Sequence, residues 1–237
     1  MMKLRSSILL LLLLACAVSM RAKTFVVSVG IADYPGKKID LRVSDNDART
    51  VAKVFQATKD ASVNILINED ATQSTLLRTI RTAFAEAQSN DAVVLYFSGH
   101  GIPGALVCHD GPLTYQRIFG MLRDCKANRK IIIADACFSG KMRTSKQQSG
   151  SYNKQNVMLF LSSRTNEASS ETQYKNSLFT IFLERGLRGG ADKNRDRKIT
   201  AREIFDFVHD GVAEASGNRQ HPVMWGKFDN NMTIIKW

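Results

Sequence analysis

The 237-residue sequence predicts an α/β fold, a three-layer α/β/α sandwich around a mainly parallel central sheet. Two observations predict this class. Apolar runs of strand length alternate with amphipathic segments at helical spacing, which is the order that builds βαβ units. The runs at 91–97 and 130–134 are almost wholly apolar, as expected for parallel strands that helices cover on both faces.

The expected elements follow one another along the chain. The expected strands are residues 25–31, 63–67, 91–97, 130–134, 157–162 and 233–235. The expected helices are residues 44–55, 72–84, 113–122, 178–187 and 201–213. Ser44 or Asp45 is the expected N-cap of the first helix, because either side chain accepts a hydrogen bond from a free backbone N–H group.

Residues 1–22 have the pattern of a secretory signal peptide, and residues 23–237 form the expected domain. Lys3 and Arg5 precede an apolar run at 8–18, which is too short for a membrane-spanning helix with normal flanks. Small residues allow cleavage after Ala17 or Ser19, although residues 13–16 also resemble a bacterial lipobox that would be lipidated at Cys16. We therefore expect export to the periplasm or the medium, with an outer-membrane lipoprotein as the alternative. Membrane attachment is expected only if Cys16 is lipidated.

The chain carries a formal net charge of +11, and its basic residues are spread along the sequence without a run of five or six. A basic balance attracts polyanions, but this spread favours a solvated basic surface over specific nucleic-acid binding. A polyanion-binding protein remains a rival interpretation.

Beyond Cys16 the cysteines are Cys108, Cys125 and Cys137, and a Cys108–Cys125 disulfide fits as well as two inert buried thiols.

Two of the apolar runs end in a reactive side chain among small residues. His100 lies between Gly99 and Gly101 after one run, and Cys137 follows the other. Because parallel strands end at the same edge of a sheet, we expect the histidine and the cysteine to meet there. A neighbouring imidazole activates a thiol that is otherwise mostly protonated at neutral pH. The sequence therefore predicts a Cys–His dyad, with the N–H groups of Gly101 and Cys137 as oxyanion donors; the alternative is a buried inert cysteine and a structural histidine.

Residues 98–101 (Ser-Gly-His-Gly) and 135–140 (Asp-Ala-Cys-Phe-Ser-Gly), in this order, resemble the caspase-like cysteine peptidases, specifically the bacterial metacaspase-like side of the family. Residues 29–34 and 41–48 resemble the family's first strand and the start of its first helix. The resemblance implies a caspase–haemoglobinase fold, with His100 as general acid and base and Cys137 as nucleophile.

The same resemblance implies that Asp47, Ser98 and Asp135 line the pocket for the P1 residue of the substrate. Carboxylates at the base of such a pocket select Arg or Lys by charge and hydrogen-bond geometry. The alternative for Asp47 is a favourable charge at a helix N-terminus.

We therefore expect a cysteine endopeptidase that cleaves protein or peptide substrates after Arg or Lys and needs no organic cofactor. No acidic residue occurs between Cys137 and Asn166, whereas Lys141, Arg143 and Lys146 lie in this stretch. Such an enzyme could cleave itself there, the alternative being an ordinary surface loop. Two further alternatives are a non-catalytic caspase-like binding or regulatory module and the gingipain-like secreted branch of the same clan.

Residues 192–203 match the calcium-binding loop of an EF-hand. The expected ligands are Asp192, Asn194, Asp196, the carbonyl of Lys198, and Glu203. Arg197 stands where the loop needs a glycine, and a left-handed conformation there costs roughly 1–2 kcal/mol. The alternative is a helix start, since a threonine at 200 and Glu203 form a capping-box pattern.

Overall fold

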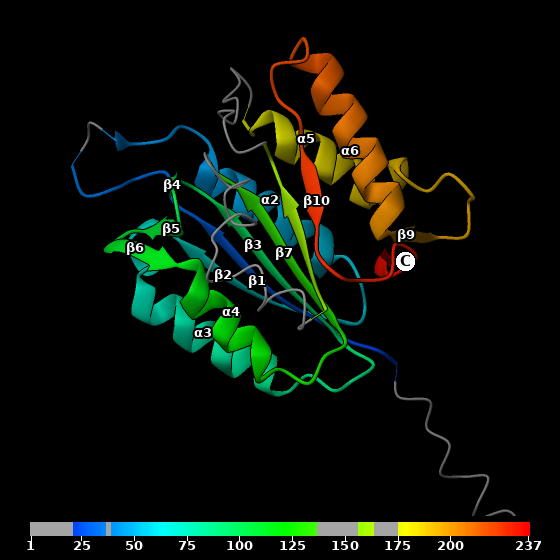
Figure 1. Ribbon diagram of the computed structural model, residues 1–237, viewed down its shortest axis with the longest axis horizontal. Helices are drawn as coiled ribbons and strands as arrows, with labels where there is room; N and C mark the ends of the chain where they lie inside the picture. Colours follow the sequence, from blue (N-terminus) through cyan, green and yellow to red (C-terminus); the bar gives the residue numbers. More distant parts are fainter. Residues whose placement is uncertain (1–20, 37–38, 137–155, 164–174) are drawn as a thin grey trace, which may run out of the picture.

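The computed structural model describes residues 21–36, 39–136, 156–163 and 175–237 (Figure 1). Its centre is a six-stranded sheet of order β10-β8-β7-β3-β1-β2. The parallel strands are β1 (Thr24–Gly30), β2 (Ala61–Ile67), β3 (Ala92–Ser98), β7 (Arg129–Asp135) and β8 (Val157–Leu161), and β10 (Val223–Trp225) is an antiparallel edge strand. The predicted mainly parallel sheet is confirmed.

Helices cover both faces of the sheet (Figure 1). One face packs against α2 (Ser44–Gln56), α5 (Leu178–Arg185) and α6 (Ala201–Ala215), and the other against α3 (Gln73–Ala85) and α4 (Tyr115–Arg123). The side chains of β1 alternate between the two layers: Phe25, Val27 and Val29 join the core under α3 and α4, and Val26 joins the opposite core. The three-layer sandwich therefore follows from two apolar faces on one sheet.

Smaller elements complete the fold. They are the antiparallel sheet of β4 (Gly101–Ile102), β5 (Ala105–Cys108) and β6 (Gly111–Thr114), the antiparallel pair of β9 (Lys198–Thr200) and β11 (Thr233–Lys236), a 3₁₀ turn η2 (Asn68–Asp70) and a π-helical turn η5 (Gly186–Gly190). The first lies at the carboxyl ends of the parallel strands, and the pair lies near their amino ends (Figure 1).

Several predicted boundaries were wrong. The helix expected from 113 begins at Tyr115, because Leu113 pairs with Leu106 in the β5–β6 hairpin. The N-cap of α2 is Val43, with no side-chain hydrogen bond, and Ser44 is the first helical residue. Helix α5 ends at Arg185, where the chain enters the π-helical turn.

The expected strands do not include the short strands β4, β5, β6, β9 and β10. Strands β9 and β10 are three residues long, too short to show an alternating pattern. The strand predicted at 233–235 exists within β11, but it pairs with β9 and stands outside the central sheet.

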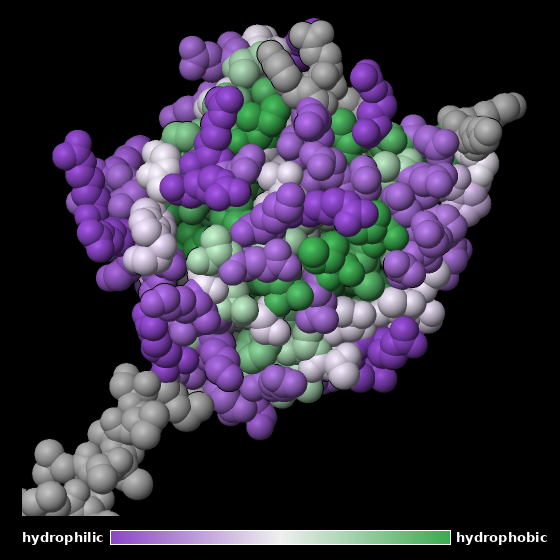
Figure 2. All heavy atoms as spheres, turned by 180° about the vertical axis from the view of Figure 1, so that it is seen from behind, coloured by the Kyte–Doolittle hydropathy of each residue, from purple (hydrophilic) through white to green (hydrophobic). Residues whose placement is uncertain are grey.

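The surface seen from behind is largely hydrophilic, with apolar areas between polar side chains (Figure 2). Within the described parts of the chain, no helix combines the length and the apolar character needed to cross a membrane. Cys108 and Cys125 are free thiols, the first buried and the second partly buried. The Cys108–Cys125 disulfide that the sequence allowed is therefore not formed in this structure.

Gly30 permits the close approach of α2 to the end of β1. A Cβ atom at this position would lie 2.2 Å from the carbonyl oxygen of Ser44 and 2.7 Å from the Cβ atom of Ala48. We predict that Gly30→Ala lowers the free energy of unfolding by about 1–3 kcal/mol, because backbone has to move to admit the methyl group. Urea denaturation measures this change.

Gly120→Ala is the matched control. Gly120 lies within α4, and a Cβ atom there would have no neighbour within 4 Å. This substitution should leave stability unchanged or raise it by up to about 1 kcal/mol, since alanine favours a helix. Equal destabilisation by both substitutions would contradict the close-approach argument.

Candidate active site

The site is built where β3 and β7 end side by side. Ser98 and Asp135, the last residues of these strands, are paired in register, and the N–H of Gly99 donates to the carbonyl oxygen of Asp135 at 3.2 Å. The two strands that precede the predicted dyad are therefore neighbours in the sheet. His100 follows β3 by two residues, whereas Cys137 lies outside the described residues.

The imidazole of His100 is fixed by two groups from the loop after β1. Its Nε2 atom lies 2.6 Å from the carbonyl oxygen of Ile39, and its ring packs on Tyr34 with 4.8 Å between ring centroids. A carbonyl oxygen only accepts hydrogen bonds, so Nε2 carries a proton. In the neutral ring, Nδ1 is consequently the atom with the free lone pair, and it is the nitrogen that can act as a base.

Tyr34 also holds the backbone at the histidine. Its buried hydroxyl accepts from the N–H of His100 at 2.9 Å and donates to the carbonyl oxygen of Val107 at 3.1 Å. Burial raises the pKa of Tyr34 well above its ordinary value, so the phenol stays protonated and keeps this donor. Gly99 leaves space for the hydroxyl, since a Cβ atom there would lie 2.7 Å from it. Tyr34 thus ties the loop after β1, the histidine and β5 together.

The carboxylate of Asp47 is fully buried and accepts three hydrogen bonds. Oδ2 accepts from the hydroxyl of Ser98 at 2.9 Å, while Oδ1 accepts from Nδ2 of Asn176 at 2.8 Å and from the N–H of Ser177 at 3.0 Å. Burial, followed by the charge of Asp135, raises the pKa of Asp47 from 3.8 to about 7, and the three donors partly oppose this rise. The carboxylate therefore faces the start of α5 and the end of β3.

Asp135 lies against the same helix start. Its Oδ2 atom accepts from the hydroxyl of Ser177 and from the hydroxyl of Thr180 at 3.4 Å. The hydroxyl of Thr180 also lies 2.6 Å from the hydroxyl of Tyr96, which belongs to β3. Asp135 is 4% exposed, so both acids of the predicted P1 pocket are buried and joined through Ser177.

The structure thus brings Asp47, Ser98 and Asp135 into one hydrogen-bonded cluster, beside the strand end that carries His100. Gly101 is buried at the start of β4, where it pairs with Leu106. The assignment of these residues to substrate binding and to the oxyanion site stays a prediction.

Several residues that contact His100 or the two acids were not predicted from the sequence. They are Tyr34, Ile39, Asn176, Ser177 and Thr180. Ser177 had a local signal, because its side chain accepts from the N–H of Thr180 as the N-cap of α5. Ile39 contributes only a backbone carbonyl, which no side-chain pattern can reveal.

In the predicted calcium loop, the turn around Asp192 and the side chain of Glu203 have different hydrogen-bond partners. Asp192 accepts from the N–H groups of Asp196 and Arg197 at 3.2 and 3.0 Å, and Arg197 adopts a left-handed conformation with φ of 64°. These bonds close a tight turn of the kind the loop requires. Asn194 and the side chain of Asp196 each accept from a backbone N–H as well.

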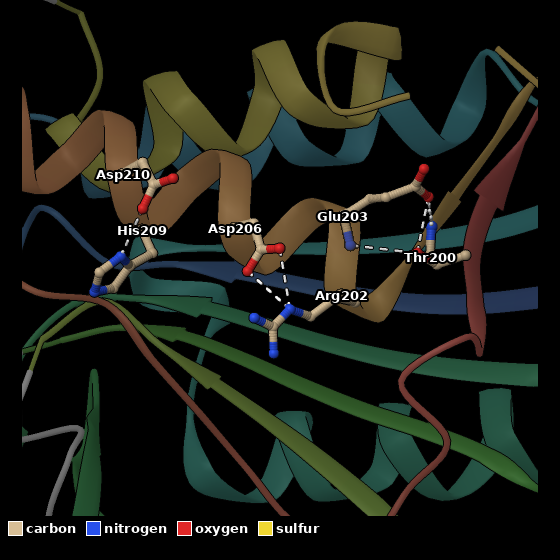
Figure 3. Close-up of polar contacts among 6 residues, drawn as sticks. All are labelled: Thr200, Arg202, Glu203, Asp206, His209 and Asp210. Atoms are coloured by element: carbon tan, nitrogen blue, oxygen red, sulfur yellow. Dashed lines mark hydrogen bonds and ion pairs between the residues drawn. The ribbon is translucent and has the colours of Figure 1, made fainter. Parts of the chain in front are cut away.

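Glu203, by contrast, turns toward the start of α6 (Figure 3). Its Oε2 atom accepts from the N–H of Thr200 at 3.0 Å and from the hydroxyl of Thr200 at 2.8 Å, which completes a capping box. In the part of the chain that the structure describes, no group of three or more His, Cys, Asp or Glu side chains is arranged to hold a metal ion. Calcium binding, for which Lys198 would add its carbonyl, stays a prediction.

Comparisons with known proteins identify the family. The family model described as Caspase domain matches residues 23–232. Protein GSU0716 from Geobacter sulfurreducens has a similar structure, with a TM-score of 0.68 and 17% sequence identity over 87% of this chain and 95% of that chain. Caspase-1 from Spodoptera frugiperda is similar with a TM-score of 0.68 and 15% identity, over 91% of this chain and 90% of that one.

A comparison with curated protein sequences found no significant match. The two structural likenesses are too low in identity to carry more than the fold, and they agree with the parallel sheet and its helical layers. The family match extends over nearly the whole described chain, and the members of this family are cysteine peptidases. The chain therefore belongs to the caspase domain family.

Proposed function

We propose that this protein is a cysteine endopeptidase that cleaves after Arg or Lys, with Cys137 as nucleophile and His100 as general acid and base. The observation that supports this most is the joint placement of His100 and the buried acids Asp47 and Asp135 around the ends of two neighbouring parallel strands. Function in open parallel sheets concentrates at this edge.

In the proposed mechanism, Nδ1 of His100 takes the proton of the Cys137 thiol, and the thiolate attacks the scissile carbonyl carbon. The N–H groups of Gly101 and Cys137 stabilise the oxyanion that forms. As the carbon–nitrogen bond breaks, His100 returns the proton to the leaving amine, which leaves a thioester on Cys137. Water, deprotonated by His100, then hydrolyses the thioester. The Ile39 carbonyl supports both steps, because it stabilises the protonated ring through Nε2.

The acid cluster accounts for the proposed specificity. The buried carboxyl groups of Asp47 and Asp135 need a cationic partner, and the guanidinium or ammonium group of a P1 Arg or Lys would supply it. Its binding would stabilise the ionised form of Asp47, whose pKa burial and Asp135 raise. Substrates are therefore proteins or peptides with basic P1 residues.

The remaining parts of the proposal follow the sequence patterns. Residues 1–22 direct export, with lipidation of Cys16 as the membrane-attached variant. The basic stretch after Cys137, with no acidic residue before Asn166, supplies the bonds for self-processing. Of these two segments, residues 1–20, 137–155 and 164–166 lie outside the described residues.

A peptidase assay tests the central proposal. We expect hydrolysis of fluorogenic peptides with Arg or Lys at P1 and none with Asp, because the pocket acids repel an acidic side chain. Cys137→Ala and His100→Ala should each lower kcat/KM by at least about 10³-fold, since each removes a group that acts in the chemical step.

Arg117→Gln is the control for these variants, since its guanidinium binds the side chain of Gln73 on the exposed surface of the α3–α4 layer. Intact-mass spectrometry of wild type and Cys137→Ala shows in addition whether the chain cleaves itself. Activity that survives both dyad substitutions would refute the proposed chemistry. An inactive wild type with intact fold would indicate the non-catalytic module instead.

The pH dependence of stability tests the burial of Asp47. Its pKa is near 7 in the folded protein and near 3.8 in the unfolded chain, so the folded state binds more protons between these values. The stability that this group contributes is complete below about pH 4 and is lost as the pH rises to about 7. Asp47→Asn removes the titration, so the unfolding free energy of wild type should fall relative to this variant across that window. Chemical denaturation at several pH values measures the difference, and two parallel curves would contradict the raised pKa.

We also propose that residues 192–203 bind calcium weakly, once Glu203 exchanges its contacts with Thr200 for the ion. The turn formed by Asp192 already has the hydrogen bonds of such a loop, but four basic residues within it oppose a divalent cation. Isothermal titration should give a dissociation constant near 10⁻⁴–10⁻³ M, the range of the weakest such loops. Asp192→Asn should abolish the heat, while Asp206→Asn, outside the loop, should preserve it. The absence of a binding heat at millimolar calcium would contradict this proposal.

A further inference from the structure

A cavity lies at the amino ends of the parallel strands, at the opposite end of the sheet from the candidate active site. It has a volume of about 170 Å³ and is formed by the first residues of β1 and β7, Thr24 and Arg129, together with the β9–β11 pair. A seven-residue strand spans about 20 Å, so the whole length of the sheet separates this cavity from His100. Figure 1 shows β9 and the C-terminus at this end of the strands.

Three cationic side chains line the cavity: Arg129, Lys198 and Lys236. Lys198 and Lys236 stand directly opposite each other in the antiparallel β9–β11 ladder. Like charges in such a pair repel, which destabilises the protein unless something negative lies between them. Among the described residues, no acidic side chain lines this cavity.

Among the described residues, no carboxylate forms an ion pair with any of the three cations. The guanidinium of Arg129 donates to the carbonyl oxygens of Thr233 and Asn90, at 3.2 and 2.8 Å, and these bonds fix its position. Within the described ranges, no hydrogen bond or ion pair engages the ammonium groups of Lys198 and Lys236.

Nearby acids have other contacts. Asp91 acts on Arg129 through its charge, but its oxygens accept from the backbone N–H groups of Lys23 and Gln88 at 2.8 Å each. Asp196 accepts from the backbone N–H of Lys198 and not from its ammonium group. Asp91 therefore compensates part of the charge of Arg129, whereas no carboxylate of the described residues pairs with the ammonium groups of Lys198 and Lys236.

We propose that this cavity is a binding site for a phosphate-type oxyanion. A multivalent oxyanion offers several acceptor oxygens to one hydrogen-bonded guanidinium and to the ammonium groups of two exposed lysines, and it relieves the repulsion between the lysines. The site is independent of the proposed peptidase chemistry. The anion comes either from a soluble phosphate or polyphosphate or from the headgroup of an anionic lipid, since this edge also holds Ala22, where the leader segment joins the domain.

The test measures binding and stability at constant ionic strength, because salt screens exposed charges. Inorganic phosphate and tripolyphosphate are titrated into wild type, Lys198→Gln and Lys236→Gln, with isothermal titration and thermal unfolding as readouts. We expect saturable binding by wild type and a dissociation constant raised about 10-fold or more by either substitution. Arg81→Gln, which removes an exposed charge from α3, is the matched control and should bind like wild type.

A second readout needs no ligand. Because each lysine substitution removes the like-charge pair, Lys198→Gln and Lys236→Gln should raise the Tm of the anion-free protein by about 1–4 °C. Arg81→Gln should not. A Tm that falls in both lysine variants would contradict the repulsion on which the proposal depends.

Vesicles identify the source of the anion. Co-flotation with phosphatidylglycerol–phosphatidylcholine vesicles but not with phosphatidylcholine alone, lost in the lysine variants, would assign the site to a lipid headgroup. Saturable tripolyphosphate binding without co-flotation would assign it to a soluble ligand. Binding that is unsaturable, or that Arg81→Gln weakens as much as the lysine variants do, would show diffuse charge attraction and overturn the site.

Discussion

Asp47 and Asp135 are two carboxylates buried among α2, β3, β7 and α5, and the structure of the carboxyl edge depends on how they are held. Burying a charged carboxylate is costly unless hydrogen bonds replace the lost water, and burying two close together adds repulsion. Ser177 links the pair, since its N–H donates to Asp47 and its hydroxyl donates to Asp135. The start of α5 is thereby fixed against the ends of the strands. A fold that only needed stability would gain little from this arrangement, which is why we connect it with substrate binding.

The histidine is held by a different set of contacts on the other side of β3. Tyr34 fixes the backbone and one ring face of His100, and the Ile39 carbonyl fixes the proton on Nε2. In the proposed function, the acid cluster recognises the charge of the P1 residue, whereas the loop after β1 sets the orientation and tautomer of His100. Gly99 makes room for the hydroxyl of Tyr34, and Gly30 makes room for the first turn of α2, which explains why each strand end carries a residue without a side chain.

The two ends of the parallel strands also differ in the charged side chains around them. The buried acids Asp47 and Asp135 lie at the carboxyl ends of the strands, whereas Arg129, Lys198 and Lys236 line a cavity around the amino ends of β1 and β7. The net charge of +11 is thus not only a property of a solvated surface, because three of the basic side chains converge on one cavity. Converging charge of this kind is not visible in a sequence whose basic residues are evenly spread.

The order of side chains was enough to predict the α/β class, the family resemblance and the candidate residues Asp47, Ser98, His100 and Asp135. Apolar runs marked the buried strands, and the motifs around His100 and Cys137 marked the ends of two of them, because strand burial and reactive side chains are local properties. The sequence did not predict that Ser177 joins Asp47 to Asp135, that Ile39 supplies a carbonyl to His100, or that Lys198 pairs with Lys236 across β9 and β11, and the folded structure shows all three. These contacts join residues that are far apart in the chain. They depend on backbone atoms and on the register between strands, and a pattern of side chains along the sequence reveals neither.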